Sequence, residues 1–96
     1  MTRAREGRGA GDGAPLRYRA TVGRYVDGKP AEIFLTNHKA GSMAGILASD
    51  SAVLASLALQ FGVPVDVLQH ALMRDARGQP TSPLGMVLDR LVKEGA

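Results

Sequence analysis

The sequence contains no cysteine and no tryptophan, and its 96 residues include only two histidines, two phenylalanines and two tyrosines. Without cysteine the chain can form no disulfide, no thiolate metal site and no thiol nucleophile. The two histidines, His38 and His70, are not at metal-ligand spacing, and no serine lies in the turn motif of a nucleophilic hydrolase. We therefore expect no catalytic residue, no metal and no cofactor, and we expect His70 on a solvated surface.

Large apolar side chains are scarce at the start of the chain. Residues 1–15 are rich in glycine and arginine and are expected to form a flexible basic tail, whereas residues 16–94 are expected to fold as a single domain. Residues 1–30 hold seven Lys and Arg against three Asp and Glu, but residues 31–96 hold five against six. The opening residues lack the apolar run of a secretory signal, so a cytoplasmic protein is expected.

Residues 16–26 and 31–37 alternate apolar and polar side chains with the period of a β-strand. Between them, Asp27 and Gly28 are residues that a tight turn needs, and Pro30 ends the loop. The pattern predicts an antiparallel hairpin. Because a two-stranded hairpin is marginal in water, we expect helices to cover it, and its edges are candidate contacts with a second copy or another protein.

Three helical patterns follow the hairpin. Between Ser42 and Phe61 apolar residues recur at steps of three and four, with Ser42 as the N-cap. A second helix is expected to begin at Pro64, and a third to follow Ser82 and Pro83. The predicted fold class is α+β, an antiparallel β-hairpin followed by three helices packed on it. The inward positions expected on the last two helices are Val65, Leu68, Leu72, Leu84, Val87, Leu88 and Leu91.

The long helix from Met43 has only one charged residue, Asp50. Its larger apolar side chains predict an inward face, and the small residues around them would let neighbouring backbones come close, so a buried central helix is expected. The large residues are Met43, Ile46, Leu47, Leu54, Leu57 and Phe61. Asp50 falls on the same face. Because an unpaired buried carboxylate is costly, we expect it to bond an arginine of the hairpin, a backbone donor or a hydroxyl, and its presence argues against a membrane span.

The segment TNHKAGS is the best candidate for a small-ligand site. Lys39 precedes Gly41 and Ser42 at the expected start of the long helix, where unbonded backbone N–H groups favour a phosphate or a carboxylate, and His38 lies beside them. The spacing is not that of a P-loop, and a plain strand-to-helix turn requires the same glycine and serine. A module that senses a nucleotide or phosphate is therefore one alternative function.

Arginines along the first strand indicate a third function. Arg17, Arg19 and Arg24, together with the basic tail, are candidate contacts for nucleic acid or for an acidic partner. A hydrated outer face on which Arg17 or Arg19 pairs with Glu32 across the hairpin accounts for the same residues.

The order of these pieces resembles the TSCPD domain, a small module named after a Thr-Ser-Cys-Pro-Asp motif. The family is found near the C-terminus of adenosylcobalamin-dependent ribonucleotide reductases and as short independent proteins. The resemblance rests on VGRYVDGKPAEIFLTNHKAGS and SLALQFGVP, and it covers about residues 18–93. Where the family carries its named motif, this chain has Thr81-Ser82-Pro83-Leu84, so the cysteine is missing and the aspartate is replaced.

The resemblance without the thiol implies a non-catalytic accessory or protein-interaction domain that contacts a second copy or another protein through its hairpin edge and helix surface. Ribonucleotide reduction needs a thiyl radical and a reducing cysteine pair, neither of which this chain can supply. A reductase label would therefore be inherited from larger family members. A homo-oligomer or a protein partner is expected, with a nucleotide and then nucleic acid as the alternatives, and no membrane.

Overall fold

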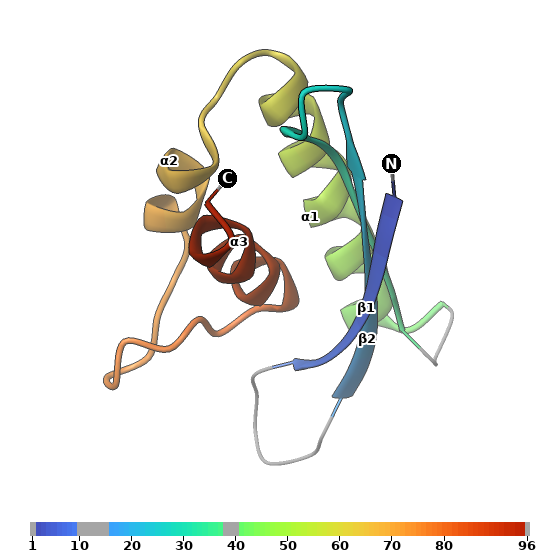
Figure 1. The fold of residues 1–96 in the computed structure, drawn as a ribbon. Helices are drawn as coiled ribbons and strands as arrows, with labels where there is room; N and C mark the ends of the chain where they lie inside the picture. The colour runs from blue at the N-terminus through green and yellow to red at the C-terminus, as the bar shows by residue number, and fades with distance from the viewer. Residues whose placement is uncertain (1, 10–15, 38–40, 96) are drawn as a thin grey trace.

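The computed structural model describes residues 2–9, 16–37 and 41–95, with side chains described from Tyr18 onward within these ranges. A three-stranded antiparallel sheet lies beside three helices (Figure 1). The strands, in the order β1-β2-β3, are β1 (Thr2–Gly9), β2 (Leu16–Arg24) and β3 (Pro30–Asn37). The helices are α1 (Met43–Gln60), α2 (Val65–Ala71) and α3 (Pro83–Lys93). The predicted α+β class, a hairpin followed by three helices, is confirmed.

The strands β2 and β3 form the expected hairpin, in which Val22 pairs with Ile33. At the turn, Gly28 adopts a φ of 89°, a conformation that glycine takes without steric cost, and its N–H donates to the Tyr25 carbonyl at 2.9 Å. The predicted alternation is confirmed along both strands. The buried residues are Tyr18, Val22, Ala31, Ile33 and Leu35, and the exposed ones on β3 are Glu32, Phe34 and Thr36.

The strand β1 occupies part of the segment for which a flexible tail was expected. It pairs antiparallel with β2, from Thr2 opposite Gly23 to Gly9 opposite Leu16. Strand pairing uses backbone N–H and C=O groups, so an extended segment can complete the edge of β2 whatever its side-chain composition. For this reason the glycine and arginine content did not reveal the strand. With β1 in place, β2 is the central strand of the sheet.

The core is formed by the sheet, the small residues of α1 and the apolar stripes of α2 and α3. Leu88 of α3 and Ile33 of β3 are its most deeply buried large residues, at 0% and 1% exposure. Every inward position predicted for these two helices is confirmed as buried or packed against the core. Ser82 caps α3 as expected, because its Oγ accepts a hydrogen bond from the Gly85 N–H at 3.0 Å.

The helix α1 packs on β3 through its small residues, so the predicted orientation of this helix is wrong. Its buried residues are Ala48, Ala52, Ala55 and Leu59, whereas the large apolar side chains that were expected inside are exposed. Small side chains let the helix backbone approach the strand closely. The small face of α1, and not its larger face, is therefore the one that meets the sheet.

Polar side chains of α1 close the outer edge of β3. Ser56 Oγ accepts a hydrogen bond from the Ile33 N–H at 2.8 Å and lies 3.1 Å from the Ile33 carbonyl oxygen. Two more bonds to β3 carbonyls come from Ser49 Oγ to Leu35 (3.1 Å) and from Gln60 Nε2 to Ala31 (3.1 Å). The β3 edge, which the sequence offered as a contact for another chain, is thus covered by the domain's own helix.

Replacing Ser56 with alanine should test this edge closure. The substitution leaves the part-buried Ile33 N–H without the acceptor that Ser56 Oγ supplies, which costs about 1–3 kcal/mol of unfolding free energy. The matched control is Ser51→Ala, because Ser51 Oγ bonds only within α1, to the Ala48 carbonyl. Denaturant unfolding should show a change within about 0.5 kcal/mol for the control. Equal stability of the two variants would contradict the proposed role of Ser56.

Candidate functional site

The outward side of α1, which we call the α1 face, exposes a row of large apolar side chains. Its apolar members are 46–87% exposed. The α1 face consists of Met43, Ile46, Leu47, Asp50, Val53, Leu54, Leu57 and Phe61. The largest apolar patch of a typical monomeric protein covers roughly 300–600 Å², and a larger patch usually marks a contact with protein or membrane. Seven large side chains along one helix reach or exceed that size.

Asp50 lies within the α1 face and is exposed, so its predicted burial is wrong. Across the described residues, no hydrogen bond or ion pair joins its carboxylate to another side chain or backbone group, and the expected tether to a hairpin arginine is absent there. The reason is the orientation of α1: the side on which Asp50 lies points away from the sheet.

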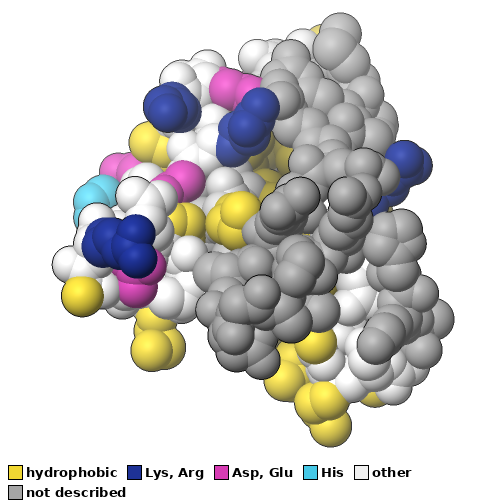
Figure 2. All heavy atoms as spheres, turned by 90° about the horizontal axis from the view of Figure 1, so that it is seen from below, with side chains coloured by type: hydrophobic (Ala, Val, Ile, Leu, Met, Phe, Trp, Pro, Cys, Tyr) yellow, Lys and Arg dark blue, Asp and Glu magenta, His cyan; other side chains and the backbone are white. Residues whose placement is uncertain are grey.

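By length and composition alone, α1 is the one helix among the described residues that could cross a membrane, with a mean hydropathy of 1.4 over 18 residues. Two features weigh against this. One side of α1 is bonded to β3 through Ser49, Ser56 and Gln60, and the other side carries Asp50. Figure 2 shows most of the charged side chains and the histidine on the left of the molecule, a Lys or Arg side chain at its right edge, and hydrophobic side chains protruding along the lower edge.

The predicted anion site at the start of α1 is only partly described. Gly41 has a φ of 83°, and Ser42 Oγ already accepts a hydrogen bond from the Gly45 N–H at 3.1 Å, as an ordinary N-cap does. His38 and Lys39 lie outside the described residues. Ligand binding at this segment stays a prediction. The Ser42 cap is also what the alternative, a plain strand-to-helix turn, requires.

Among the three arginines predicted to contact nucleic acid, Arg24 has partners within the domain. Its side chain is 15% exposed, and its guanidinium donates to the Gly28 carbonyl at 2.8 Å and pairs with Glu94 at 3.3 Å. This pair fastens the hairpin to the end of α3. Arg19 is exposed, and the side chain of Arg17 lies outside the described ones. Nucleic-acid binding by this strand stays a prediction.

The segment from Thr81 to Leu84 has a structural role at the start of α3. The N–H and the Oγ1 of Thr81 both lie 3.3 Å from the Met73 carbonyl oxygen, Ser82 caps the helix, and Pro83 occupies its first turn. Gly85 is buried at the same point, where an added Cβ would come within 3.0 Å of Pro80. These contacts fix the loop before α3 without any thiol.

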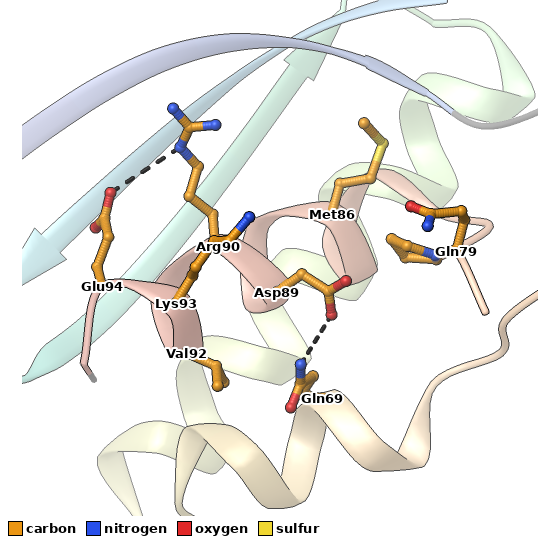
Figure 3. A pocket seen from close by; sticks show the side chains of 9 residues that line it. Gln69, Gln79, Met86, Asp89, Arg90, Val92, Lys93 and Glu94 are labelled. Carbon is orange, nitrogen blue, oxygen red and sulfur yellow. Dashed lines mark hydrogen bonds and ion pairs between the residues drawn. The ribbon is translucent and has the colours of Figure 1, made fainter.

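A shallow cleft of about 750 Å³ lies between α2 and α3, and three of its four charged side chains have charged partners (Figure 3). Asp89 accepts hydrogen bonds from Gln69 Nε2 at 3.0 Å and from both terminal nitrogens of Arg74, one of them at 3.1 Å. Arg90 and Glu94 are 4.0 Å apart. The sequence analysis missed this network, because Asp89 and Arg74 come together only when the loop after α2 folds back onto α3. Its groups serve to hold that loop.

The Arg74 guanidinium holds the pKa of Asp89 below its ordinary value, mainly through their hydrogen bond. A lowered carboxyl pKa contributes stability above the ordinary pKa of about 3.9, and the contribution is lost as pH falls through the folded-state pKa. Asp89→Asn should therefore lower the melting temperature at pH 7, and the deficit should shrink as the pH falls below about 3.9. The control Asp75→Asn keeps an oxygen that can accept the bonds of the Arg77 and Gln79 N–H groups. An Asp89→Asn deficit that persists unchanged at pH 2.5 would contradict this account.

With the geometry described, the chain can be placed by comparison. The TSCPD domain family matches residues 12–93, so the chain belongs to the TSCPD domain family. It is 43% identical over 47 residues to a vitamin B12-dependent ribonucleotide reductase of Rhodopirellula baltica. This match covers 49% of this chain and 4% of that reductase. It is 37% identical over 63 residues to the enzyme of the same name from Bradyrhizobium diazoefficiens, and this match covers 66% of this chain and 5% of that enzyme. No solved structure matches the chain. The chain thus spans about a twentieth of the length of these reductases.

Within the described residues, no group of three or more His, Cys, Asp and Glu residues is placed to hold a metal ion. His70 is exposed, as predicted, with its Nδ1 2.7 Å from the Asp66 carbonyl oxygen. In the α2–α3 cleft, Asp89, Arg90 and Glu94 already have partners within the domain, whereas the large apolar side chains of the α1 face are exposed. We therefore take the α1 face as the candidate functional site.

Proposed function

We propose that this chain is a non-catalytic accessory domain, related to the TSCPD module of vitamin B12-dependent ribonucleotide reductases, that acts by binding protein through the α1 face. The observation that carries the proposal is the exposure of seven large apolar side chains on one helix, at 46–87% each. Burying such side chains against a partner contributes about 1.5–3 kcal/mol each when burial is complete, so a covered α1 face is strongly favoured.

The orientation of α1 supports the proposal. The helix is fixed to β3 by Ser49, Ser56 and Gln60, so it cannot turn its large side chains inward without losing these bonds. The exposed side chains are therefore a stable property of the fold. A rigid apolar helix surface suits binding, because little conformational entropy is lost when a partner covers it.

The reductase relationship supports an accessory function in place of catalysis. The chain has no cysteine, and the family motif at Thr81 to Leu84 has become a helix cap with an adjacent loop contact. Thiyl-radical chemistry and the re-reduction of a thiol pair both require cysteine. What this chain shares with the module is the family match over residues 12–93.

A turnover assay tests the non-catalytic part. The purified chain, supplied with adenosylcobalamin, a ribonucleotide and a dithiol reductant, should form no deoxyribonucleotide, because the chain has no thiol to carry the radical. Product formation would be measured by chromatography against a full-length reductase as the positive control. Deoxyribonucleotide above the level of a protein-free blank would refute a non-catalytic domain.

Cysteine labelling in cells tests whether protein covers the α1 face. Since the natural chain has no cysteine, Leu54→Cys reports on the α1 face and Val67→Cys on an exposed apolar position of α2. A membrane-permeant maleimide should label Leu54→Cys several-fold more slowly than Val67→Cys in intact cells, and both should react alike after denaturation. Equal labelling in cells would show an uncovered α1 face and would end the proposal.

A further inference from the structure

Six members of the α1 face form a regular seam. They recur at alternating steps of four and three residues, which is the 3.5-residue repeat that helices use to pack side chains between those of another helix. The seam consists of Met43, Leu47, Asp50, Leu54, Leu57 and Phe61. The contacts of α1 with β3 and α3 arise on its other side, where the alanines are buried. The seam is therefore exposed and can pack against one further helix.

We propose that this helix is α1 of a second copy of the chain, lying antiparallel to the first. The inference rests on the proposed function, since it names the occupant of the α1 face. It makes the domain a symmetric dimer in which the same surface of each copy contributes the same residues.

The seam matches itself in the antiparallel direction. When the two helices cross at the level of Ala52, Met43 lies opposite Phe61 of the second copy, and Leu47 lies opposite Leu57. Asp50 then lies opposite Leu54. Each facing pair then joins a residue from the N-terminal half of one helix to a residue from the C-terminal half of the other. The wide Phe61 is therefore placed against the slender Met43 and not against Phe61 of the second copy.

Asp50 favours this direction over the parallel one. In a parallel pair the two Asp50 carboxylates would face each other in an apolar seam, where like charges repel strongly. In the antiparallel pair they are offset by four residues, about 6 Å along the helix axis, so their mutual repulsion is weaker. Each carboxylate still lies opposite Leu54, and the four wholly apolar layers of the seam must outweigh its desolvation cost. The helix dipoles also oppose each other in this arrangement.

The flanks of the seam also suit a second copy. One flank carries Ile46 and Val53, and the other carries the small residues Ala44, Ser51 and Ala58. Apart from Asp50, the seam and these flanks hold no charged residue, so they offer no charge pattern for a different, charged helix. A standard stable interface buries about 800 Å² per partner. The seven large apolar side chains of the α1 face, which are 46–87% exposed, are the surface that each copy contributes toward it.

The mass of the purified chain in solution is the first test. Light scattering over a concentration series should give twice the 10.1 kDa mass of one chain at the highest concentrations. Leu54→Asp should raise the dissociation constant at least about 100-fold, equivalent to about 2.8 kcal/mol. Val67→Asp, an equally drastic change on α2, should leave the constant unchanged. Leu54 is 67% exposed, and a circular dichroism spectrum checks that the variant folds.

Cross-linking tests the direction. In the antiparallel dimer Leu47 is opposite Leu57 but about 15 Å along the axis from its own equivalent. A short bis-maleimide should therefore join Leu47→Cys to Leu57→Cys when the two variants are mixed, and should leave each variant alone largely uncross-linked. Efficient cross-linking of each variant with itself would mean a parallel pair and would overturn the proposed arrangement.

The remaining outcomes separate this inference from the proposed function. A chain that stays monomeric at every concentration overturns the dimer. If the monomer floats with vesicles of neutral phospholipid, a membrane covers the α1 face. If it does not float, yet Leu54→Cys remains protected in cells, a different protein covers the face, and only the dimer is refuted.

Discussion

The hydrogen bonds between Ser56 and the backbone of Ile33 fix the rotation of α1, and with it the surface that the domain presents. A strand edge needs partners for its N–H and C=O groups, and here the Ser56 hydroxyl accepts from the Ile33 N–H while Ser49 and Gln60 donate to carbonyls of the same strand. Ala52 and Ala55 beside Ser56 are small enough to let the helix come this close. The large side chains of α1 must then point outward, because they lie on the opposite side of the same helix.

A domain of this size has few residues with which to form both a core and a binding surface. Its core is supplied mainly by the hairpin and α3, where Leu88 and Ile33 are fully buried. The ionic groups that are described serve mostly to hold segments together: Arg74 with Asp89 fixes the loop before α3, and Arg24 with Glu94 ties the hairpin to its end. This leaves α1 as the element whose outward side chains have no structural task, which is consistent with an accessory domain that works by contact.

The sequence predicted those parts of the fold whose pattern has one interpretation. Alternation predicted the hairpin, Ser42 and Ser82 predicted the helix starts, and the spacing of leucines predicted the stripe of α3. It failed for β1, because backbone pairing leaves no mark on side-chain composition. It failed for the orientation of α1, because the helix has a large apolar side and a small one, and hydrophobicity alone chooses the larger. The recurrence of Ser49 and Ser56 one heptad apart among alanines was the available signal of close packing on a strand edge.

The central claim is the rotation of α1, and a cysteine scan along this helix in the dilute, monomeric protein tests it most directly. Each variant that keeps the wild-type circular dichroism spectrum would be labelled with a maleimide, and its rate compared with that of the denatured chain. The account predicts fast labelling at Leu47, Leu54 and Leu57 and strong protection at Ala52 and Ala55. The opposite labelling pattern, with the alanine positions reactive and the leucine positions protected, would contradict the account.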